Sequence, residues 1–275
     1  MALSQLTIFG AGLIGGSIAL AARKNGVAQR IIVIDRDETT ELDTDGKWRS
    51  AAHETKIWLK TSSLTVLCIP VRAIVELLPG MLHDSDHPIT DCGSTKEAIA
   101  LSVKNHPKRG LFVAGHPMAG SPRGGLKNAS EELYKNCRWL LCPENSDESS
   151  TSLVRQFVES LGAHVIELNA KEHDSAVAIT SHVPQVLASV LSVQAAAHQA
   201  TEAAGPGYAS ATRVAGGAEE IWRDIFETNG PRVGEALLEI AERIKKLGTE
   251  LSEAKIEGTL ESLSQARALH DPSAK

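Results

Sequence analysis

The sequence predicts an α/β protein in which a doubly wound sheet is followed by an all-helical region. Apolar runs of strand length alternate with helical patterns as far as about residue 169. A glycine-rich turn at residues 10–15 comes directly after the first of these runs. From about residue 170 onward no further strand-like run occurs. We therefore expect two domains, residues 1–169 and residues 170–275.

Length and composition allow two ordinary domains with substantial cores. The chain has 275 residues, of which 42% are hydrophobic and 23% are charged, and a domain typically holds roughly 150 residues. The net charge of −6 argues against a nucleic-acid binder, which is normally basic. Aromatic residues make up 4%, which leaves little for base stacking. The composition is typical of a soluble protein that binds no nucleic acid.

The cysteines and the N-terminus predict a reducing, cytoplasmic location. The four cysteines are Cys68, Cys92, Cys137 and Cys142, without a Cys-x-x-Cys pair. Buried free thiols are their expected state. The first residues lack the basic start and long apolar core of a signal peptide. The long apolar stretch at residues 175–197 contains His182, Pro184 and several serines, which favours a buried helix over a membrane span.

The first 35 residues carry a βαβ unit with a dinucleotide-binding fingerprint. Residues 6–9 form a short β-type run, and residues 10–17 read Gly-Ala-Gly-Leu-Ile-Gly-Gly-Ser. A helical pattern follows through Lys24, and a second β-branched run at residues 31–34 ends in Asp35. Strand, glycine turn, helix and strand within about 30 residues is the order that a Rossmann-type site requires.

Each residue type in this fingerprint has a physical reason. Gly10 allows the tight turn, Gly12 lets a pyrophosphate approach the backbone, and Gly15 lets the helix pack against the strand. The helix N-terminus offers free N–H groups and a positive dipole end to the phosphates. Asp35 is placed to accept hydrogen bonds from a ribose diol, which favours NAD, while the neighbouring Arg36 leaves NADP open. The expected cofactor-binding residues are Gly10, Gly12, Leu13, Ile14, Gly15, Asp35, Arg36 and Pro70.

Two polar motifs follow later strands of the predicted sheet. The later strands are expected at residues 64–69, 89–91, 111–114, 139–141 and 164–166. Ser94 and His116 each come shortly after one of them, and loops at the carboxyl ends of such strands gather where a cofactor binds. Residues 115–125 hold four glycines and two prolines, so we expect a loop there. This loop would carry His116 beside Ser94 at the nicotinamide end.

The second half is predicted to be helical and to dimerise. A long helix is expected over residues 171–204, kinked by Pro184 close to His182. Further helices are expected over residues 218–227 and 231–270. The long helix is almost wholly apolar and needs burial on every side, which is more than about 100 residues of helix can provide alone. We therefore expect a homodimer formed through this half.

With these residues in hand, the chain resembles the prephenate/arogenate dehydrogenases, the cyclohexadienyl dehydrogenases of tyrosine biosynthesis. The resemblance covers nearly the whole length. Besides residues 10–17, it rests on Asp-Cys-Gly-Ser-Thr-Lys at 91–96, Gly-His-Pro-Met-Ala-Gly-Ser at 115–121, Ser-His-Val-Pro at 181–184, Ala-Thr-Arg-Val-Ala at 211–215, and Ile-Trp-Arg-Asp-Ile at 221–225 with Asn229. Several motifs in one order are far more specific than the glycine fingerprint alone.

The resemblance implies NAD(P)-dependent oxidative decarboxylation of prephenate to 4-hydroxyphenylpyruvate, or of arogenate to tyrosine. It implies His116 as the hydrogen-bond acceptor or general base, a role that suits histidine. Ser94 would orient His116 and touch the nicotinamide, and Arg213 would clamp a substrate carboxylate. The implied substrate-binding residues are Arg213, His182, Ser121 and Trp222, with Trp222 reaching the active site of the second subunit.

The residues by themselves leave plainer interpretations open. Ser94 could be the N-cap of a helix beginning at Thr95, and Lys96 a solvated helix residue. A histidine such as His182 on an apolar helix is more often a satisfied core residue than a ligand. Arg213 could equally belong to a surface or interface ion pair.

Three positions depart from the family pattern. Pro122 and Ser210 stand where acids are common, so an ionic gate with the arginine stays open. Gln185 replaces a frequent histidine, which leaves open whether prephenate or arogenate is preferred. Two other functions remain as alternatives: a β-hydroxyacid dehydrogenase, for which the helix carries only Lys171 at its start, and an NAD-binding protein without catalysis.

Overall fold

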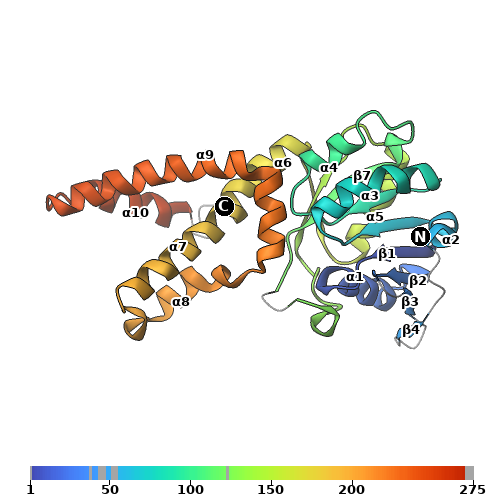
Figure 1. Ribbon diagram of the computed structural model, residues 1–275, viewed down its shortest axis with the longest axis horizontal. Helices are drawn as coiled ribbons and strands as arrows, with labels where there is room; N and C mark the ends of the chain where they lie inside the picture. The colour runs from blue at the N-terminus through green and yellow to red at the C-terminus, as the bar shows by residue number, and fades with distance from the viewer. Residues whose placement is uncertain (1, 37–38, 43–47, 51–54, 122–123, 270–275) are drawn as a thin grey trace. The chain divides into compact units, whose positions relative to one another are not determined.

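The computed structural model describes residues 2–36, 39–42, 48–50, 55–121 and 124–269. The chain divides into two compact units, residues 1–230 and residues 231–275, each of which is considered by itself. The first unit contains the sheet and the helices that cover it (Figure 1). Pro122, one of the departures from the family pattern, lies outside the described residues.

The sheet is of the doubly wound type that the sequence predicts. Its described strands follow the order β4-β3-β2-β1-β5-β6-β7-β8-β9. Their bounds are Leu3–Phe9 (β1), Ala28–Ile34 (β2), Thr39–Leu42 (β3), Trp48–Ser50 (β4), Leu64–Leu67 (β5), Ile89–Asp91 (β6), Phe112–Pro117 (β7), Arg138–Cys142 (β8) and His164–Glu167 (β9). Strand β1 pairs in parallel with both β2 and β5, so the strand order reverses beside it. Such a reversal opens a crevice at the carboxyl ends of the strands, where ligands of this fold bind.

Helices cover both faces of the sheet and bury two apolar clusters. The helices of the α/β part are Leu13–Lys24 (α1), Thr55–Thr61 (α2), Val71–Asp84 (α3), Glu97–Ser102 (α4) and Glu148–Ser160 (α5). Helices α1 and α5 pack on one face, through Ile18 and Phe157 for example. Helices α2, α3 and α4 pack on the other, through Trp58 and Ile74. Burial on both faces explains why the strands read as continuous apolar runs.

In the glycine turn between β1 and α1, backbone carbonyl oxygens lie very close to two of the glycines. Gly10 has a φ of +102°, and a Cβ there would lie 2.3 Å from the carbonyl oxygen of Cys68. A Cβ on Gly15 would lie 2.0 Å from the carbonyl oxygen of Gly10. Neither position can therefore carry a side chain without moving the strand, the turn or the helix.

Helices follow the sheet, as expected, but their boundaries differ from the prediction. Helix α6 (Ala170–Val177) passes through a π-helical segment, Ala178–His182, into α7 (Val183–Ala197), which ends earlier than residue 204. The irregular turn lies directly before Pro184, whose missing N–H cannot close a regular turn there. After η4 (Thr201–Ala203), α8 (Pro206–Thr212) and η5 (Arg213–Gly216), helix α9 (Glu219–Ser252) runs through Pro231 without a break. The expected interruption at Pro231 is wrong, and the chain turns at residues 253–256 instead, before α10 (Glu257–Leu269).

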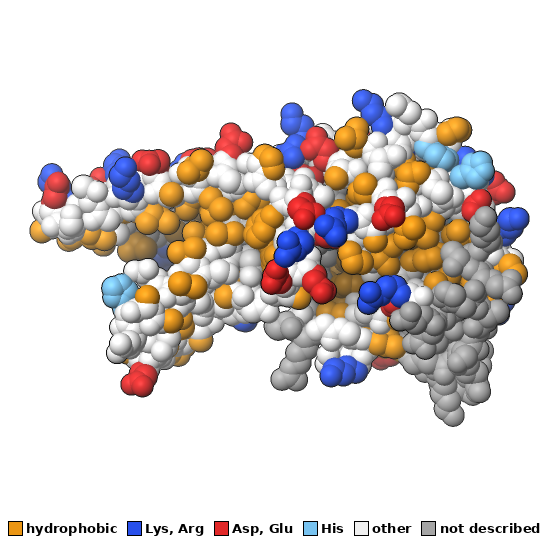
Figure 2. All heavy atoms as spheres, in the orientation of Figure 1, with side chains coloured by type: hydrophobic (Ala, Val, Ile, Leu, Met, Phe, Trp, Pro, Cys, Tyr) orange, Lys and Arg blue, Asp and Glu red, His pale blue; other side chains and the backbone are white. Residues whose placement is uncertain are grey.

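Much of the apolar surface of α7 is open to solvent in the single chain. Leu187, Val190, Leu191 and Val193 are all exposed, and Figure 2 shows apolar side chains gathered on the surface of the helical part. By length and composition alone, residues 170–197 are the described stretch that could cross a membrane. An 18-residue window within it has a mean hydropathy of 1.5, and a third of that window is buried. The same composition is expected of a helix that packs in an assembly. The four cysteines are free, as expected, but only Cys142 is buried, and Cys68, Cys92 and Cys137 are half-buried.

Candidate active site

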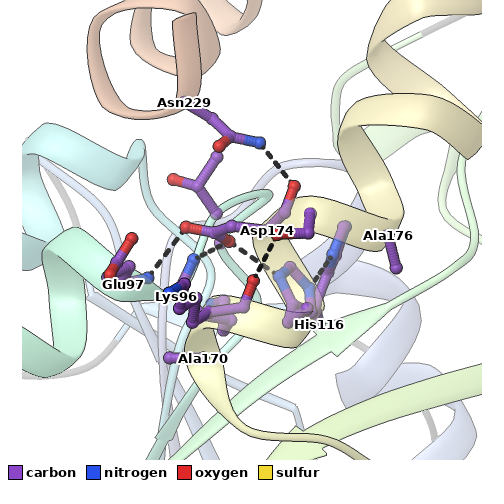
Figure 3. Close-up of polar contacts among 12 residues, drawn as sticks. Lys96, Glu97, His116, Ala170, Asp174, Ala176 and Asn229 are labelled. Atoms are coloured by element: carbon purple, nitrogen blue, oxygen red, sulfur yellow. Dashed lines mark hydrogen bonds and ion pairs between the residues drawn. The ribbon is translucent and has the colours of Figure 1, made fainter. Parts of the chain in front are cut away.

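The candidate site lies at the carboxyl ends of β6 and β7, beneath α6 (Figure 3). His116 is the fifth residue of β7, opposite Leu140 of β8. The expectation that residues 115–117 form a loop is therefore wrong. The antiparallel return of β8 extends the strand beyond the apolar run, and Pro117 is tolerated because it is the last residue of the strand.

The ring of His116 is joined to a buried histidine–carboxylate pair on α6. Its Nδ1 atom lies 2.9 Å from Nε2 of His173, and Nδ1 of His173 lies 2.8 Å from Oδ1 of Asp174. His173 and Asp174 are both fully buried, whereas His116 retains some accessible surface. Three residues therefore form one chain of hydrogen bonds that ends at the more open ring.

Asp174 is held ionised by its donors. Its Oδ1 accepts a hydrogen bond from the backbone N–H of Lys96 at 2.7 Å, and its Oδ2 accepts one from that of Glu97 at 3.0 Å. Burial alone would raise the pKa of Asp174, but the hydrogen bonds from His173 and from these two N–H groups outweigh it and hold the pKa below its ordinary value. Asp174 also caps the N-terminus of α4, so one carboxylate joins α6 to the nucleotide-binding sheet.

The ionised carboxylate fixes the tautomers of both rings. Asp174 can only accept, so Nδ1 of His173 carries the proton and its Nε2 has the lone pair. That lone pair accepts from Nδ1–H of His116, which leaves Nε2 of His116 as an acceptor. Burial is the main cause that lowers the pKa of His116 well below its ordinary value, followed by electrostatic interactions with His173, Lys96 and His182. The ring is therefore neutral at pH 7 and can take a proton.

Lys96, which could have been a solvated helix residue, is fully buried instead. Its ammonium pairs with the buried carboxylate of Asp91 and donates to the carbonyl oxygen of Gly115 at 2.8 Å. The prediction that Lys96 is solvated is wrong, because the turn after β6 directs its side chain toward Asp91 and Gly115 rather than outward into solvent.

Ser94 lies half-buried on the turn between β6 and α4. It is not the N-cap of the following helix, because α4 begins at Glu97 and the carboxylate of Asp174 caps it. The partner of the His116 Nδ1 atom is His173 rather than Ser94. The contact of Ser94 with a nicotinamide remains a prediction.

His182 and Trp222 lie next to one another beside this chain of hydrogen bonds. The Nδ2 atom of Asn229 lies 3.4 Å from Nδ1 of the buried His182 and donates to the carbonyl oxygen of Asp174 at 2.8 Å. The rings of His182 and Trp222 meet edge to face with centroids 6.0 Å apart. Burial lowers the pKa of His182 to about 4, so this ring too is neutral at pH 7.

The structure does not bring Arg213 and Ser121 into this cluster. Both are exposed, Arg213 at the start of η5 and Ser121 after β7. Within the described part of the chain, no hydrogen bond or ion pair holds the Arg213 guanidinium. Segment η5 is tied to α7 by Gln185, whose amide donates to the carbonyl oxygen of Ala215 at 3.4 Å. The substrate-binding roles of both residues remain predictions.

The glycine turn fits a dinucleotide. A Cβ on Gly12 would meet no atom within 4 Å, so the backbone there is open to a ligand. The N-cap residue of α1, Gly12, has no side chain to cap the helix, and the first turn holds no acidic residue, which leaves the positive helix end for a phosphate. The carboxylate of Asp35 accepts from the N–H groups of Ala11 at 2.6 Å and Arg36 at 2.7 Å. Leu13, Ile14 and Pro70 lie at the starts of α1 and α3, on the same sheet edge.

Sequence reasoning missed four residues of the site. His173, Asp174, Asp91 and Lys96 received no function. Two of them, Asp91 and Lys96, are the first and last residues of the motif at 91–96. An acid and a base five residues apart around a tight turn could have predicted this ion pair. His173 and Asp174 follow a capping box formed by Asn169 and Glu172, which predicts the helix but not what it faces.

A doubly wound sheet with an open glycine turn and a neutral histidine acceptor at the same edge defines a nucleotide-dependent oxidoreductase. Residues 18–167 match the family model described as prephenate dehydrogenase, nucleotide-binding domain, and residues 169–265 match prephenate dehydrogenase, dimerization domain. The chain therefore belongs to the prephenate dehydrogenase family and is a dehydrogenase.

Individual relatives agree with this assignment. The chain is 31% identical over 281 residues to a prephenate dehydrogenase of Bacillus subtilis (strain 168), covering 97% of this chain and 75% of that protein. It is 26% identical to a cyclohexadienyl dehydrogenase of Zymomonas mobilis, covering 90% and 88%. The crystal structure of Synechocystis arogenate dehydrogenase superposes with a TM-score of 0.79 at 26% identity, covering 96% and 98%.

Proposed function

We propose that this chain is a prephenate dehydrogenase, which converts prephenate to 4-hydroxyphenylpyruvate with NAD⁺ in tyrosine biosynthesis. The observation that carries the proposal is the hydrogen-bonded chain from Asp174 through His173 to His116. It leaves a neutral acceptor nitrogen at the sheet edge to which the open glycine turn also belongs. The similarity to the prephenate dehydrogenase of Bacillus subtilis supports the choice of substrate.

The chemistry requires a proton acceptor at the substrate hydroxyl. NAD⁺, held at the glycine turn, would supply the acceptor for the hydride that leaves the carbinol carbon. Nε2 of His116 takes the hydroxyl proton, and the hydrogen bond from Nδ1–H of His116 to His173, which Asp174 orients, keeps Nε2 free to accept it. Loss of carbon dioxide then completes the aromatic ring. Ser94 and His182 are proposed to contact the nicotinamide and the substrate, from the turn before α4 and from α6–α7.

The cofactor preference follows from Asp35. Gly10, Gly12 and Gly15, with the N–H groups of Leu13 and Ile14, would hold the pyrophosphate, and Asp35 would accept hydrogen bonds from the ribose hydroxyls. A 2′-phosphate would be repelled by the Asp35 carboxylate, although Arg36 beside it could pair with one. We therefore propose NAD⁺ as the cofactor, with NADP⁺ as the alternative.

The helical region is proposed to bind the substrate and to form a homodimer. The matched dimerization domain and the exposed apolar side chains of α7 support this. Arg213 would clamp a carboxylate through its planar guanidinium, Ser121 would contact the substrate, and Trp222 would reach the partner's site. We propose the functional boundary at residues 169 and 170, and a cytoplasmic location for the enzyme.

Arogenate is the second candidate substrate. Gln185 is a buried neutral amide whose nitrogen donates to the carbonyl oxygen of Ala215. This position therefore supplies no charge that could distinguish the side chain of prephenate from that of arogenate. The similarity to the Zymomonas cyclohexadienyl dehydrogenase and to the Synechocystis arogenate dehydrogenase also supports arogenate as a candidate substrate.

A matrix of two substrates and two cofactors tests the proposal. Prephenate and arogenate are each combined with NAD⁺ and NADP⁺, and the reduced nicotinamide is followed by absorbance. The highest kcat/KM is expected with prephenate and NAD⁺, and a higher value with arogenate would select the second candidate. NAD⁺ binding without reduced cofactor from any pair would contradict both and leave a non-catalytic binding protein.

A further inference from the structure

The ion pair between Asp91 and Lys96 is buried without exposure of either side chain. Asp91 is the last residue of β6, and Lys96 is the residue before α4. Removing two charges from water is costly, and well-packed apolar residues are often as stabilising as such a pair. Stability alone therefore does not explain why this pair is here.

The pair holds both hydrogen-bonding groups of one residue, Gly115. The Lys96 ammonium donates to the Gly115 carbonyl oxygen at 2.8 Å. The Gly115 N–H donates to Oδ1 of Asp91 at 3.0 Å, while the other carboxylate oxygen accepts from the N–H of Gly93 at 2.8 Å. Because Gly115 directly precedes His116, the ion pair fixes the backbone from which the candidate base projects.

Two glycines make room for this clamp. A Cβ on Gly93 would lie 3.2 Å from the Lys96 ammonium nitrogen, and a Cβ on Gly115 would lie 2.9 Å from the Asp91 carbonyl oxygen. The motifs at residues 91–96 and 115–121 therefore meet in one cluster. Their glycines leave the space that the ion pair and the neighbouring backbone occupy.

We propose that Lys96 is a positioning residue, which aims His116 by clamping the Gly115 peptide and places a fixed positive charge beside the residue that precedes it. The proposal rests on the proposed function, in which His116 accepts the hydroxyl proton. The charged and titratable groups around His116 are Asp91 from β6, Lys96 before α4, His173 and Asp174 from α6, and His182 before α7. Strand β8 places Leu140 opposite His116.

Loss of the Lys96 charge has a predictable sign. Its charge helps to lower the pKa of His116, after burial and the electrostatic interaction with His173. Without it, Asp91 is left as an unbalanced negative charge that favours the imidazolium. The pH below which His116 is protonated, and below which activity is lost, should therefore rise.

Lys96→Met tests the proposal, with Arg109→Met as the matched control. Arg109 is another buried cation, located just before β7, and it donates to the carbonyl oxygens of Phe112 at 2.6 Å and Glu144 at 2.7 Å. Both variants remove a buried cation that binds a β7 carbonyl, but only Lys96 binds the peptide next to His116. The readouts are kcat, KM, NAD⁺ affinity, the pH profile of kcat/KM, and an NMR titration of the His116 ring without ligand.

For Lys96→Met we expect kcat to fall about 10²-fold, as misplacement of a catalytic group can cause, with NAD⁺ affinity nearly unchanged. The acid limb of the pH profile and the ring titration should both move to higher pH. Arg109→Met should lower thermal stability while leaving the pH profile in place. The double variant Asp91→Asn with Lys96→Met removes both charges. The acid limb of its pH profile should therefore return toward its wild-type position, while kcat should stay low. The double variant also supplies the rate measurement if the single variant does not fold.

Wild-type kcat and pH profile in Lys96→Met would overturn the proposal, as would the same changes in Arg109→Met. If the wild-type protein reduces no cofactor with either cyclohexadienyl substrate, the proposed function fails by itself. The ring titration of His116 in the wild type and in Lys96→Met then still decides whether Lys96 acts on this histidine.

Discussion

His173 lies between His116 and Asp174, with its Nε2 atom 2.9 Å from one and its Nδ1 atom 2.8 Å from the other. The two hydrogen bonds pass through opposite nitrogens of one ring, so the protonation of Asp174 decides which nitrogen of His116 is free. A residue on α6 thus sets the chemistry of a residue on β7. The same arrangement of carboxylate, imidazole and reacting group serves the Ser-His-Asp enzymes.

Replacement of His116 tests its role as the proton acceptor. In His116→Asn we expect kcat to fall by about 10²–10⁴-fold, the usual contribution of a positioned base. NAD⁺ affinity, measured by quenching of tryptophan fluorescence, should remain close to the wild-type value because the glycine turn is untouched. A kcat within about threefold of wild type, far below that contribution, would remove His116 from the reaction.

Two replacements of His173 distinguish its role as a hydrogen-bond acceptor for His116 from a role in packing alone. The amide introduced by His173→Gln can offer a carbonyl oxygen to Nδ1–H of His116, whereas the side chain introduced by His173→Leu cannot. In His173→Leu we expect kcat to fall at least about 10-fold further than in His173→Gln. In the leucine variant Nδ1 of His116 has lost its hydrogen-bond acceptor, so the proton of the neutral His116 ring is no longer held on Nδ1. Steady-state kinetics at neutral pH and a melting curve for each variant are the measurements. Equal rates in the two variants would show that His173 only fills space.

The proposed carboxylate clamp predicts a change in substrate binding. Arg213→Ala should raise KM for the cyclohexadienyl substrate by about 10–10²-fold, the value of a charge-assisted hydrogen bond, and should change kcat little. A clamp of this kind holds the substrate and the transition state alike. Arg243→Ala is the control, because Arg243 is exposed and paired with Glu239 one helical turn away. An unchanged KM in Arg213→Ala would remove Arg213 from the site.

The sequence predicts the local elements of this fold better than the contacts between them. The turn at Gly10, helix α1 and strand β6 follow from short patterns, and the structure contains all three. The extension of β7 to His116 does not, because it depends on pairing with β8, more than about 20 residues further along the chain. A strand that ends in glycine and proline gives no local sign of that pairing.

The site shows the same division. His116 and Ser94 could be found because each comes shortly after an apolar, strand-like run in the sequence, and such runs end at the sheet edge. His173 lies 57 residues from His116 in the sequence, and only the packing of α6 on the sheet brings the two rings together. Lys96 was open to a wrong interpretation because a lysine at the start of a helix is normally solvated. Its burial depends on Asp91, whose carboxylate lies under the same turn.

Acid should destabilise the fold through His87, a buried histidine just before β6. Its Nε2 atom lies 2.8 Å from the hydroxyl oxygen of Thr65, and burial lowers the pKa of His87 to about 4. The ordinary value of about 6.5 applies in the unfolded chain, so between these two values the unfolded state binds a proton that the folded state does not. Stability from this group is therefore complete above about pH 6.5 and is lost as the pH falls toward about 4.

Comparison with His87→Gln isolates this contribution, because the amide can bond to Thr65 but does not titrate. The free energy of unfolding, from urea denaturation, should fall between about pH 7 and pH 5 by about 2 kcal/mol more in the wild type than in the variant. All other titrating groups are common to both proteins and cancel in the difference. An equal fall in both proteins would mean that the pKa of His87 is the same in the folded and unfolded chains, and that its burial does not oppose protonation.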